Sequence, residues 1–140
     1  MRVLFDSSAL FKRYVDEQGR DAVLAAMDHT ETLLAAPHCR VELHGALARL
    51  GREGRLDARA LRLTRDEIDQ SFEQVEVLPL TPGVERAAIQ ALDLGPLRAM
   101  DALHIGAALV GRADLFVTAD RRQAEAAAAT GLRTQLIEVF

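Results

Sequence analysis

The segment Arg2-Val3-Leu4-Phe5-Asp6-Ser7-Ser8-Ala9-Leu10 is a short apolar run with an acid and two serines directly after it. The pattern predicts a strand over residues 2–5, followed at once by a helix that Ser7 or Ser8 can cap. In open α/β sheets, ligands bind outside the carboxyl ends of the strands, where helix N-termini also point. Asp6 therefore stands where chemistry is expected, although Asp is also a favoured N-cap residue and that role alone would explain it.

The composition is that of a globular protein. The 140 residues suggest one domain, spanning 1–140, that is large enough to bury a stable core. Apolar residues make up 49% and charged residues 27%, which a disordered chain would not show. Cys39 is the only cysteine, so an intramolecular disulfide and a multi-thiolate zinc site are excluded. No apolar stretch is long enough to cross a bilayer and no signal-peptide pattern occurs, so we expect a cytoplasmic protein with no membrane partner.

The net charge is −4, which at first argues against a nucleic-acid partner, because phosphate binding is usually driven by basic surface. Aromatic residues make up only 4% and Trp is absent, so base-stacking platforms are not expected. Lys12 is the only lysine, and arginine supplies every other basic residue. The acidic balance allows a polyanionic partner only if the acids gather at one site that a cation can neutralise.

Apolar runs and helical periodicity alternate along the chain. Strands are predicted over residues 2–5, 32–36, 77–80, 114–118 and 133–139, the last at an edge. Helices are predicted between them, over about 7–14, 22–27, 37–50, 57–75, 83–92, 98–109 and 121–130. Pro37 suits the first turn of its helix, and Thr81 with Pro82 starts another. This alternation predicts an α/β fold with three layers, in which helices cover both faces of a mostly parallel sheet.

The predicted helical hairpin over residues 37–75 carries more apolar residues than one core contact needs, including Leu56, Leu63 and Ile68. A domain of this size should not leave a large apolar patch in water. We therefore expect this hairpin to contribute to a twofold dimer or to a groove for a partner helix.

Four carboxylates stand at strand ends and helix starts. Asp6 and Asp120 directly follow apolar strands, whereas Glu42 and Asp101 lie in the first turns of predicted helices. Each alone has a structural explanation, because helix N-termini favour acidic side chains. Together they indicate one shared site. Oxygen ligands without a His or Cys cluster favour Mg²⁺ or Mn²⁺ over zinc, with Asp6, Asp101 and Asp120 as ligands and Glu42 as a ligand or as the group that orients water.

Other catalytic patterns are absent. No pair of histidines has the four-residue spacing of a metalloprotease helix, and no phosphate-binding glycine loop or dinucleotide fingerprint occurs. Ser7 and Ser8 lack a nucleophile elbow. His104, three residues after Asp101 in an apolar helix, is expected to be a buried and hydrogen-bonded histidine.

The motifs that carry a family resemblance are Asp6-Ser7-Ser8-Ala9-Leu10, Val41-Glu42-Leu43, Asp101-Ala102-Leu103-His104-Ile105 and Val117-Thr118-Ala119-Asp120. In this order and spacing, the chain resembles a PIN domain, in particular the VapC-type toxins of bacterial toxin–antitoxin pairs. The resemblance covers nearly the whole chain. Asp114 is a further acid that the motifs do not include, and it is expected at the opposite edge of the sheet.

The resemblance implies a five-stranded parallel sheet and a metal-dependent endoribonuclease whose acidic cluster is Asp6, Glu42, Asp101 and Asp120. It also implies a homodimer and inhibition by a cognate, VapB-like antitoxin. Ser7 and Thr118 are expected to support the acidic side chains by hydrogen bonds. The groups expected to hold the RNA backbone are Lys12, Arg13 and Arg98.

Three other functions remain open from the sequence. A phosphotransfer enzyme could use Asp6 as its nucleophile, but such haloacid-dehalogenase-like sites usually have a second Asp where Ser8 stands. A receiver-like signalling module would need an acidic pair at the first strand end and a lysine late in the chain, and Lys12 is the only lysine. A PIN-like fold that only binds a partner is the third.

Overall fold

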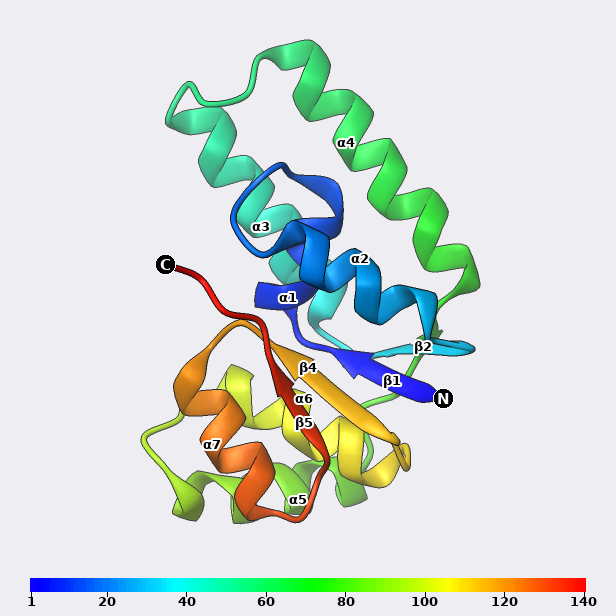
Figure 1. The fold of residues 1–140 in the computed structure, drawn as a ribbon, viewed down its shortest axis with the longest axis vertical. Coiled ribbons are helices and arrows are strands. Elements are labelled where there is room, and N and C mark those ends of the chain that lie inside the picture. The colour runs from blue at the N-terminus through cyan, green and yellow to red at the C-terminus, as the bar shows by residue number, and fades with distance from the viewer.

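The computed structural model describes residues 1–140 and contains one five-stranded, all-parallel sheet covered by helices on both faces (Figure 1). The strands lie in the order β3-β2-β1-β4-β5 and comprise β1 Arg2–Phe5, β2 Thr32–Ala35, β3 Glu76–Val77, β4 Leu115–Thr118 and β5 Thr134–Leu136. The helices are α1 Ser7–Tyr14, α2 Arg20–Asp28, α3 Cys39–Arg52, α4 Ala58–Ser71, α5 Pro82–Ala91, α6 Ala99–Val110 and α7 Arg121–Ala129, with 3₁₀ turns η1 Phe72–Gln74 and η2 Leu92–Leu94. The predicted α/β fold is confirmed.

The sheet separates two hydrophobic clusters. Val3 and Phe5 of β1 pack into the cluster formed with α1 to α4, whereas Leu4 packs into the cluster formed with α5 to α7. Figure 1 shows these two groups of helices on opposite sides of the strands. Because successive side chains of a strand point to opposite faces, a strand buried on both faces reads as a continuous apolar run. This is why residues 3–5 form an unbroken apolar run.

The central strands place their ends together. β1 pairs with β4 in a register that sets Phe5 beside Val117. The chain leaves both strands at the same edge, and the Asp6 amide donates to the Val117 carbonyl oxygen at 3.0 Å. Parallel pairing therefore brings the residues after β1 and β4 into contact. None of the helices is long and apolar enough to cross a membrane.

Four local predictions were wrong, one of them the last strand, which was expected over residues 133–139 and is only Thr134–Leu136. The helix expected from Pro37 begins at Cys39, because Pro37 and His38 form a turn in which His38 is the N-cap. The strand expected over 77–80 is only Glu76–Val77; Leu78 still donates to Ala35, but Pro79 has no N–H with which to continue the ladder. Ile68 of α4 was expected to be one of the apolar residues that the hairpin does not need for its own core contact. It is instead fully buried in the core.

Candidate active site

Asp6 lies at the carboxyl end of β1 and is both an N-cap and a buried acid. Its Oδ1 accepts hydrogen bonds from the Ala9 amide at 2.9 Å and the Ser8 hydroxyl at 2.7 Å, and its Oδ2 accepts from the Thr118 hydroxyl at 2.5 Å. Only 2% of the residue is exposed. Burial raises the pKa of Asp6, against the lowering effects of His104 and of these three donors.

Thr118 links β1 to the start of α7. Its hydroxyl donates to Asp6 and accepts from the Asp120 amide at 3.0 Å. Asp120 in turn caps α7, with Oδ1 2.9 Å from the Arg122 amide and 3.3 Å from the Gln123 amide. These bonds fix the Asp120 carboxylate at the same sheet edge as Asp6.

Asp101 lies in the first turn of α6 and is half-buried. The buried Gln123 side chain donates to the Asp101 carbonyl oxygen at 2.7 Å, which ties α6 to α7. Burial and the nearby negative charge of Asp120 both raise the pKa of Asp101. Burial is the larger cause, and repulsion between the Asp101 and Asp120 carboxylates adds to it.

Glu42, in the first turn of α3, has a different environment. Its Oε1 accepts from the Ser7 hydroxyl at 2.5 Å and from His104 Nε2 at 2.7 Å, with His38 Nε2 at 3.4 Å. Burial alone would raise the pKa of Glu42, but the hydrogen bonds from His104 and Ser7 outweigh it and hold the pKa below its usual value. Glu42 is thus a stable carboxylate without any cation from outside the chain.

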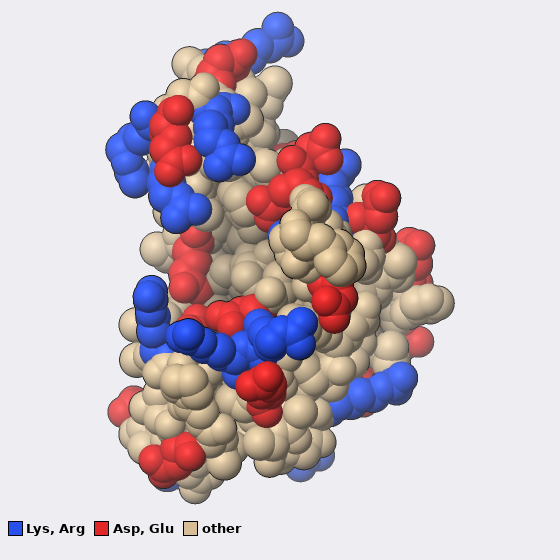
Figure 2. Space-filling model, turned by 60° about the vertical axis from the view of Figure 1, so that its left-hand side comes forward, with Lys and Arg blue, Asp and Glu red and all other residues tan.

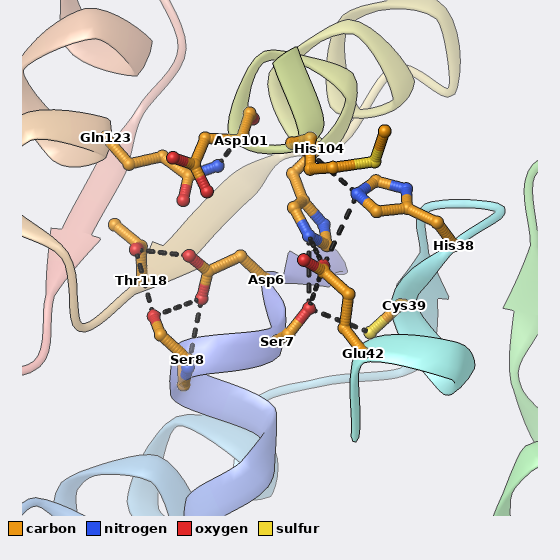
Figure 3. Close-up of polar contacts among 12 residues, drawn as sticks. Asp6, Ser7, Ser8, His38, Cys39, Glu42, Asp101, His104, Thr118 and Gln123 are labelled. Carbon is orange, nitrogen blue, oxygen red and sulfur yellow. Dashed lines mark hydrogen bonds and ion pairs between the residues drawn. The ribbon is translucent and has the colours of Figure 1, made fainter. Parts of the chain in front are cut away.

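The four carboxylates border one cleft of about 150 Å³ at the carboxyl edge of the sheet (Figure 3), lined by Asp6, Ser7, Ser8, Glu42, Asp101, His104, Asp120 and Gln123. Asp6 with Ser8 and Thr118 forms one half of the network, and Glu42 with Ser7 and the histidines forms the other. Asp114 lies at the opposite edge, where its Oδ2 accepts from the Arg2 amide. The structure therefore brings together the four acids that the sequence singled out and leaves Asp114 outside.

The donor set fits a hard divalent cation. Asp6, Asp101 and Asp120 make no ion pair with any basic side chain. In keeping with this, the pKa values of Asp6 and Asp101 are raised. Three uncompensated oxygen ligands around one cleft suit Mg²⁺ or Mn²⁺. His38, Glu42 and His104 also have ligand atoms within 4.8 Å of one another, but both histidine Nε2 atoms donate in hydrogen bonds and offer no lone pair to a metal. A carboxylate oxygen that accepts a hydrogen bond keeps a second lone pair with which it can coordinate. The all-oxygen group is therefore the better cation site.

Of the three basic residues expected to hold RNA, only Arg98 lies in a hollow beside the acids of the cleft. Arg98 is exposed and, with Arg122, lines a second hollow of about 520 Å³ that also borders Glu42, Asp101 and Asp120. Figure 2 shows basic side chains in a band beside acidic ones in a hollow of this face. Lys12 is buried and pairs with Glu17 at 3.0 Å, and Arg13 lies over the Tyr14 ring. Neither of these two lines the acidic cleft.

The comparisons with known proteins assign the family. A family model described as the PIN domain matches residues 3–129. The chain belongs to the PIN domain family. No curated protein sequence matches this PIN domain, whereas several solved structures share its fold.

Three solved structures illustrate how much of the PIN domain is shared. FitAcB from Neisseria gonorrhoeae superposes with a TM-score of 0.70 at 15% identity, covering 94% of this chain and 95% of that one. VapC20 of Mycobacterium tuberculosis, described as a Sarcin-Ricin loop cleaving toxin, gives 0.68 at 16% identity, covering 93% and 95%. A toxin–antitoxin complex from Klebsiella pneumoniae gives 0.65 at 11% identity, covering 86% and 88%. At these identities the similarity establishes the shared fold.

Sequence reasoning missed two residues of the site in this PIN domain. Gln123 stands three residues after Asp120, the spacing of a capping box, and that signal could have identified it. The Gln123 side chain, on α7, instead donates to the Asp101 carbonyl oxygen on α6. His38 is the other: its ring donates toward the Met100 carbonyl oxygen, 62 residues away, and no local pattern indicates that contact.

Proposed function

We propose that this PIN domain is a Mg²⁺- or Mn²⁺-dependent endoribonuclease that hydrolyses RNA phosphodiester bonds, and that it acts as the toxin of a toxin–antitoxin pair. The observation that carries the proposal is the convergence of Asp6, Asp101 and Asp120 on one cleft without a cationic partner. The described activity of VapC20, a structural neighbour, supports RNA as the substrate class. Such an activity would act on cellular RNA in the cytoplasm.

The proposed roles follow from the contacts. Asp6, Asp101 and Asp120 would hold the divalent ion, which supplies positive charge where negative charge builds on the phosphoryl oxygens. Glu42 is ionised, and its Oε2 makes no hydrogen bond within the chain, so it can orient a water and accept its proton. Thr118 and Ser7 hold Asp6 and Glu42, respectively.

Substrate binding is proposed for Arg98, with Arg122 beside it in the hollow next to the acids. Both are exposed and make no ion pair, so their guanidinium groups are free to bind phosphates. Lys12 and Arg13 were also expected from the sequence to bind RNA. Their pairing with Glu17 and stacking on Tyr14 make them weaker candidates.

The residue two positions after Asp6 argues against a phosphotransfer reaction with Asp6 as nucleophile. Ser8 occupies the position of the second acid that such enzymes use, and its hydroxyl donates to Asp6. The deciding assay compares Mg²⁺- or Mn²⁺-dependent cleavage of RNA with hydrolysis of a small phosphate ester. RNA cleavage that is lost in Asp101→Asn and kept in Asp114→Asn supports the nuclease. Hydrolysis of the ester alone, or RNA binding without cleavage, rejects it.

We further propose that a small VapB-like antitoxin encoded beside this gene, and a second copy of the chain, are the partners. The solved toxin–antitoxin complex of similar fold supports the first. On the α3–α4 hairpin, Val41 and Leu63 remain exposed, at 73% and 55%. We expect the antitoxin to place an Arg or Lys at Asp6, Asp101 and Asp120. Co-expression with a neighbouring short reading frame tests the antitoxin, and light scattering tests the dimer.

A further inference from the structure

Two histidines from opposite sides of the sheet meet beyond its carboxyl edge (Figure 3). His38 is the N-cap of α3, and His104 lies on α6; their ring centroids are 4.3 Å apart, with 44° between the ring planes. Each ring bonds to the other helix. His104 Nε2 lies 2.7 Å from Glu42 Oε1 on α3, and His38 Nε2 lies 2.8 Å from the Met100 carbonyl oxygen on α6.

The partners of these rings define which nitrogen donates. An ionised carboxylate and a carbonyl oxygen can only accept hydrogen bonds, so both Nε2 atoms must donate. The Nδ1 atoms of His38 and His104 are both buried and have no hydrogen-bond partner. Nothing in the chain accepts a hydrogen bond from either Nδ1, so the two contacts between the helices need only the Nε2 protons. Each histidine is a donor to the other helix without having to be charged.

The two histidine bonds connect α3 and α6 at a place where the sheet does not separate them. Leu43 of α3 belongs to the hydrophobic cluster on one face of the sheet, and Ile105 of α6 belongs to the cluster on the other face. The sheet lies between the two clusters, so α3 and α6 can meet only past its edge. Glu42 follows His38 by four residues, and Asp101 follows Met100 directly. The two reciprocal bonds therefore join the helix turns that carry two of the four carboxylates.

We propose that His38 and His104 form a reciprocal clasp that sets the separation of Glu42 and Asp101 across the cleft. Both histidines are positioning residues: they act through the carboxylates and contact neither RNA nor the ion. The purpose of the clasp rests on the proposed metal-dependent function, but the clasp itself can be tested without cleavage. A competing possibility is a metal ion bound by the two histidines and Glu42. It would have to break both bonds and would leave each Nδ1–H without the acceptor that metal-bound histidines normally have.

Replacing each histidine by Gln and by Asn tests whether its hydrogen bond, and not merely its packing, is required. The side-chain nitrogen of Gln can reach the position of a histidine Nε2, whereas that of Asn ends one bond short. We expect His104→Asn to weaken Mn²⁺ binding about 10- to 100-fold, measured from the electron paramagnetic resonance of free Mn²⁺, and His104→Gln to stay near wild type. The kcat for RNA should fall in parallel in His104→Asn while KM changes little. His38→Asn and His38→Gln should behave as a second such pair.

The double variant and a control complete the test. Because the clasp fails as a unit, His38→Asn with His104→Asn should bind Mn²⁺ little more weakly than either single variant. His44→Asn is the control, since His44 bonds to Asp69 across α3 and α4 and not at the cleft. It should leave Mn²⁺ binding unchanged.

Several results would overturn the clasp: wild-type Mn²⁺ affinity in His104→Asn, equal losses in the Gln and Asn variants, or losses that add fully in the double variant. Zn²⁺ binding that survives Asp101→Asn and disappears in His38→Asn would establish the competing site instead. If His104→Asn does not fold, the His38 pair carries the test, because that side chain is partly exposed, at 16%. A wild-type chain that cleaves no RNA would refute the nuclease while the Mn²⁺ measurements still decide the clasp.

Discussion

The carboxyl groups of Asp6 and Asp101 have no basic side chain as an ion-pair partner. Burial is the main reason that their pKa values are raised, and Asp120 adds repulsion at Asp101. The folded chain therefore binds protons on these groups more tightly than the unfolded chain does. Such groups favour the folded state below their ordinary pKa and oppose it increasingly as the pH rises through the folded-state pKa. Without a divalent ion, the site is a source of instability at neutral pH.

Asp101→Asn should make the metal-free protein more stable at pH 7, because the amide removes both the burial of a charge and the repulsion from Asp120. A gain in Tm of roughly 2 to 4 °C corresponds to about 1 kcal/mol in a domain of this size. The gain should shrink as the pH falls through the raised pKa of Asp101, and it should vanish below about pH 4, where the carboxyl is neutral in the folded and the unfolded chain alike. Thermal melting in EDTA as a function of pH measures both.

The same variant should lose RNA cleavage, and Mg²⁺ should raise the Tm of the wild type but not that of Asp101→Asn. A clear fall in Tm in EDTA would mean instead that Asp101 serves mainly the N-terminus of α6. That outcome would leave the helix-dipole explanation standing.

Thr118→Val tests how strongly Asp6 depends on its donors. Valine has the shape of threonine but cannot donate to Asp6 Oδ2 or accept from the Asp120 amide. We expect a loss of about 1 to 3 kcal/mol in the free energy of unfolding, because buried polar groups are left without partners. Mn²⁺ affinity should fall about 10- to 100-fold. Urea denaturation and Mn²⁺ titration measure the two effects, and Thr118→Ser, which keeps the hydroxyl, should show little of either.

At the level of elements, the sequence predicted whatever depends on neighbouring residues. The apolar runs before Asp6 and Asp120 identified β1 and β4, and parallel pairing then placed both acids at one edge. Thr81 and Pro82 correctly marked the start of α5. Local pattern could not show that His38 bonds to Met100 or that Ile68 is buried, because each depends on an element far away in the chain. The acids of the site were predictable, but the contacts that orient them were not.

The pair α5 and α6 packs closely at Gly106. A Cβ at this position would lie 2.6 Å from the Val84 carbonyl oxygen and 2.9 Å from the Ala88 amide nitrogen, both of which are backbone atoms that cannot easily shift. Gly106→Ala should therefore destabilise the fold by about 1 to 3 kcal/mol, despite the higher helix propensity of alanine. Gly45 on α3 is the matched control, since a Cβ there meets nothing within 4 Å.

Gly45→Ala should stabilise the chain by about 0.5 to 1 kcal/mol, because alanine has the higher helix propensity and there is room for it. Urea denaturation of both variants gives the comparison. Equal effects at the two positions would mean that α6 can move away from α5 without cost. The helix that carries Asp101 and His104 would then be less rigidly placed than the structure indicates.

For the molecule as a whole, the arrangement of charges predicts that RNA binding and divalent-ion binding depend on each other. The net charge of −4 repels a polyanion, and the acids of the cleft lie beside the arginines of the neighbouring hollow. A divalent ion in the cleft would remove the local repulsion and leave Arg98 and Arg122 to attract the backbone. The overall acidity of the chain is then compatible with RNA binding only in the metal-loaded state.

We therefore expect single-stranded RNA to bind weakly in EDTA and far more tightly with Ca²⁺, a divalent ion offered in place of Mg²⁺, as measured by fluorescence anisotropy. With Ca²⁺, log K should fall with log salt by about 0.7 for each phosphate neutralised, so Arg98→Gln and Arg122→Gln should each reduce the slope by roughly that amount. Arg121→Gln is the control on the same helix as Arg122, because Arg121 lies near Glu138 and lines neither hollow. It should leave the slope unchanged. Tight RNA binding in EDTA, or equal slopes in all three variants, would place the RNA on another surface of the molecule.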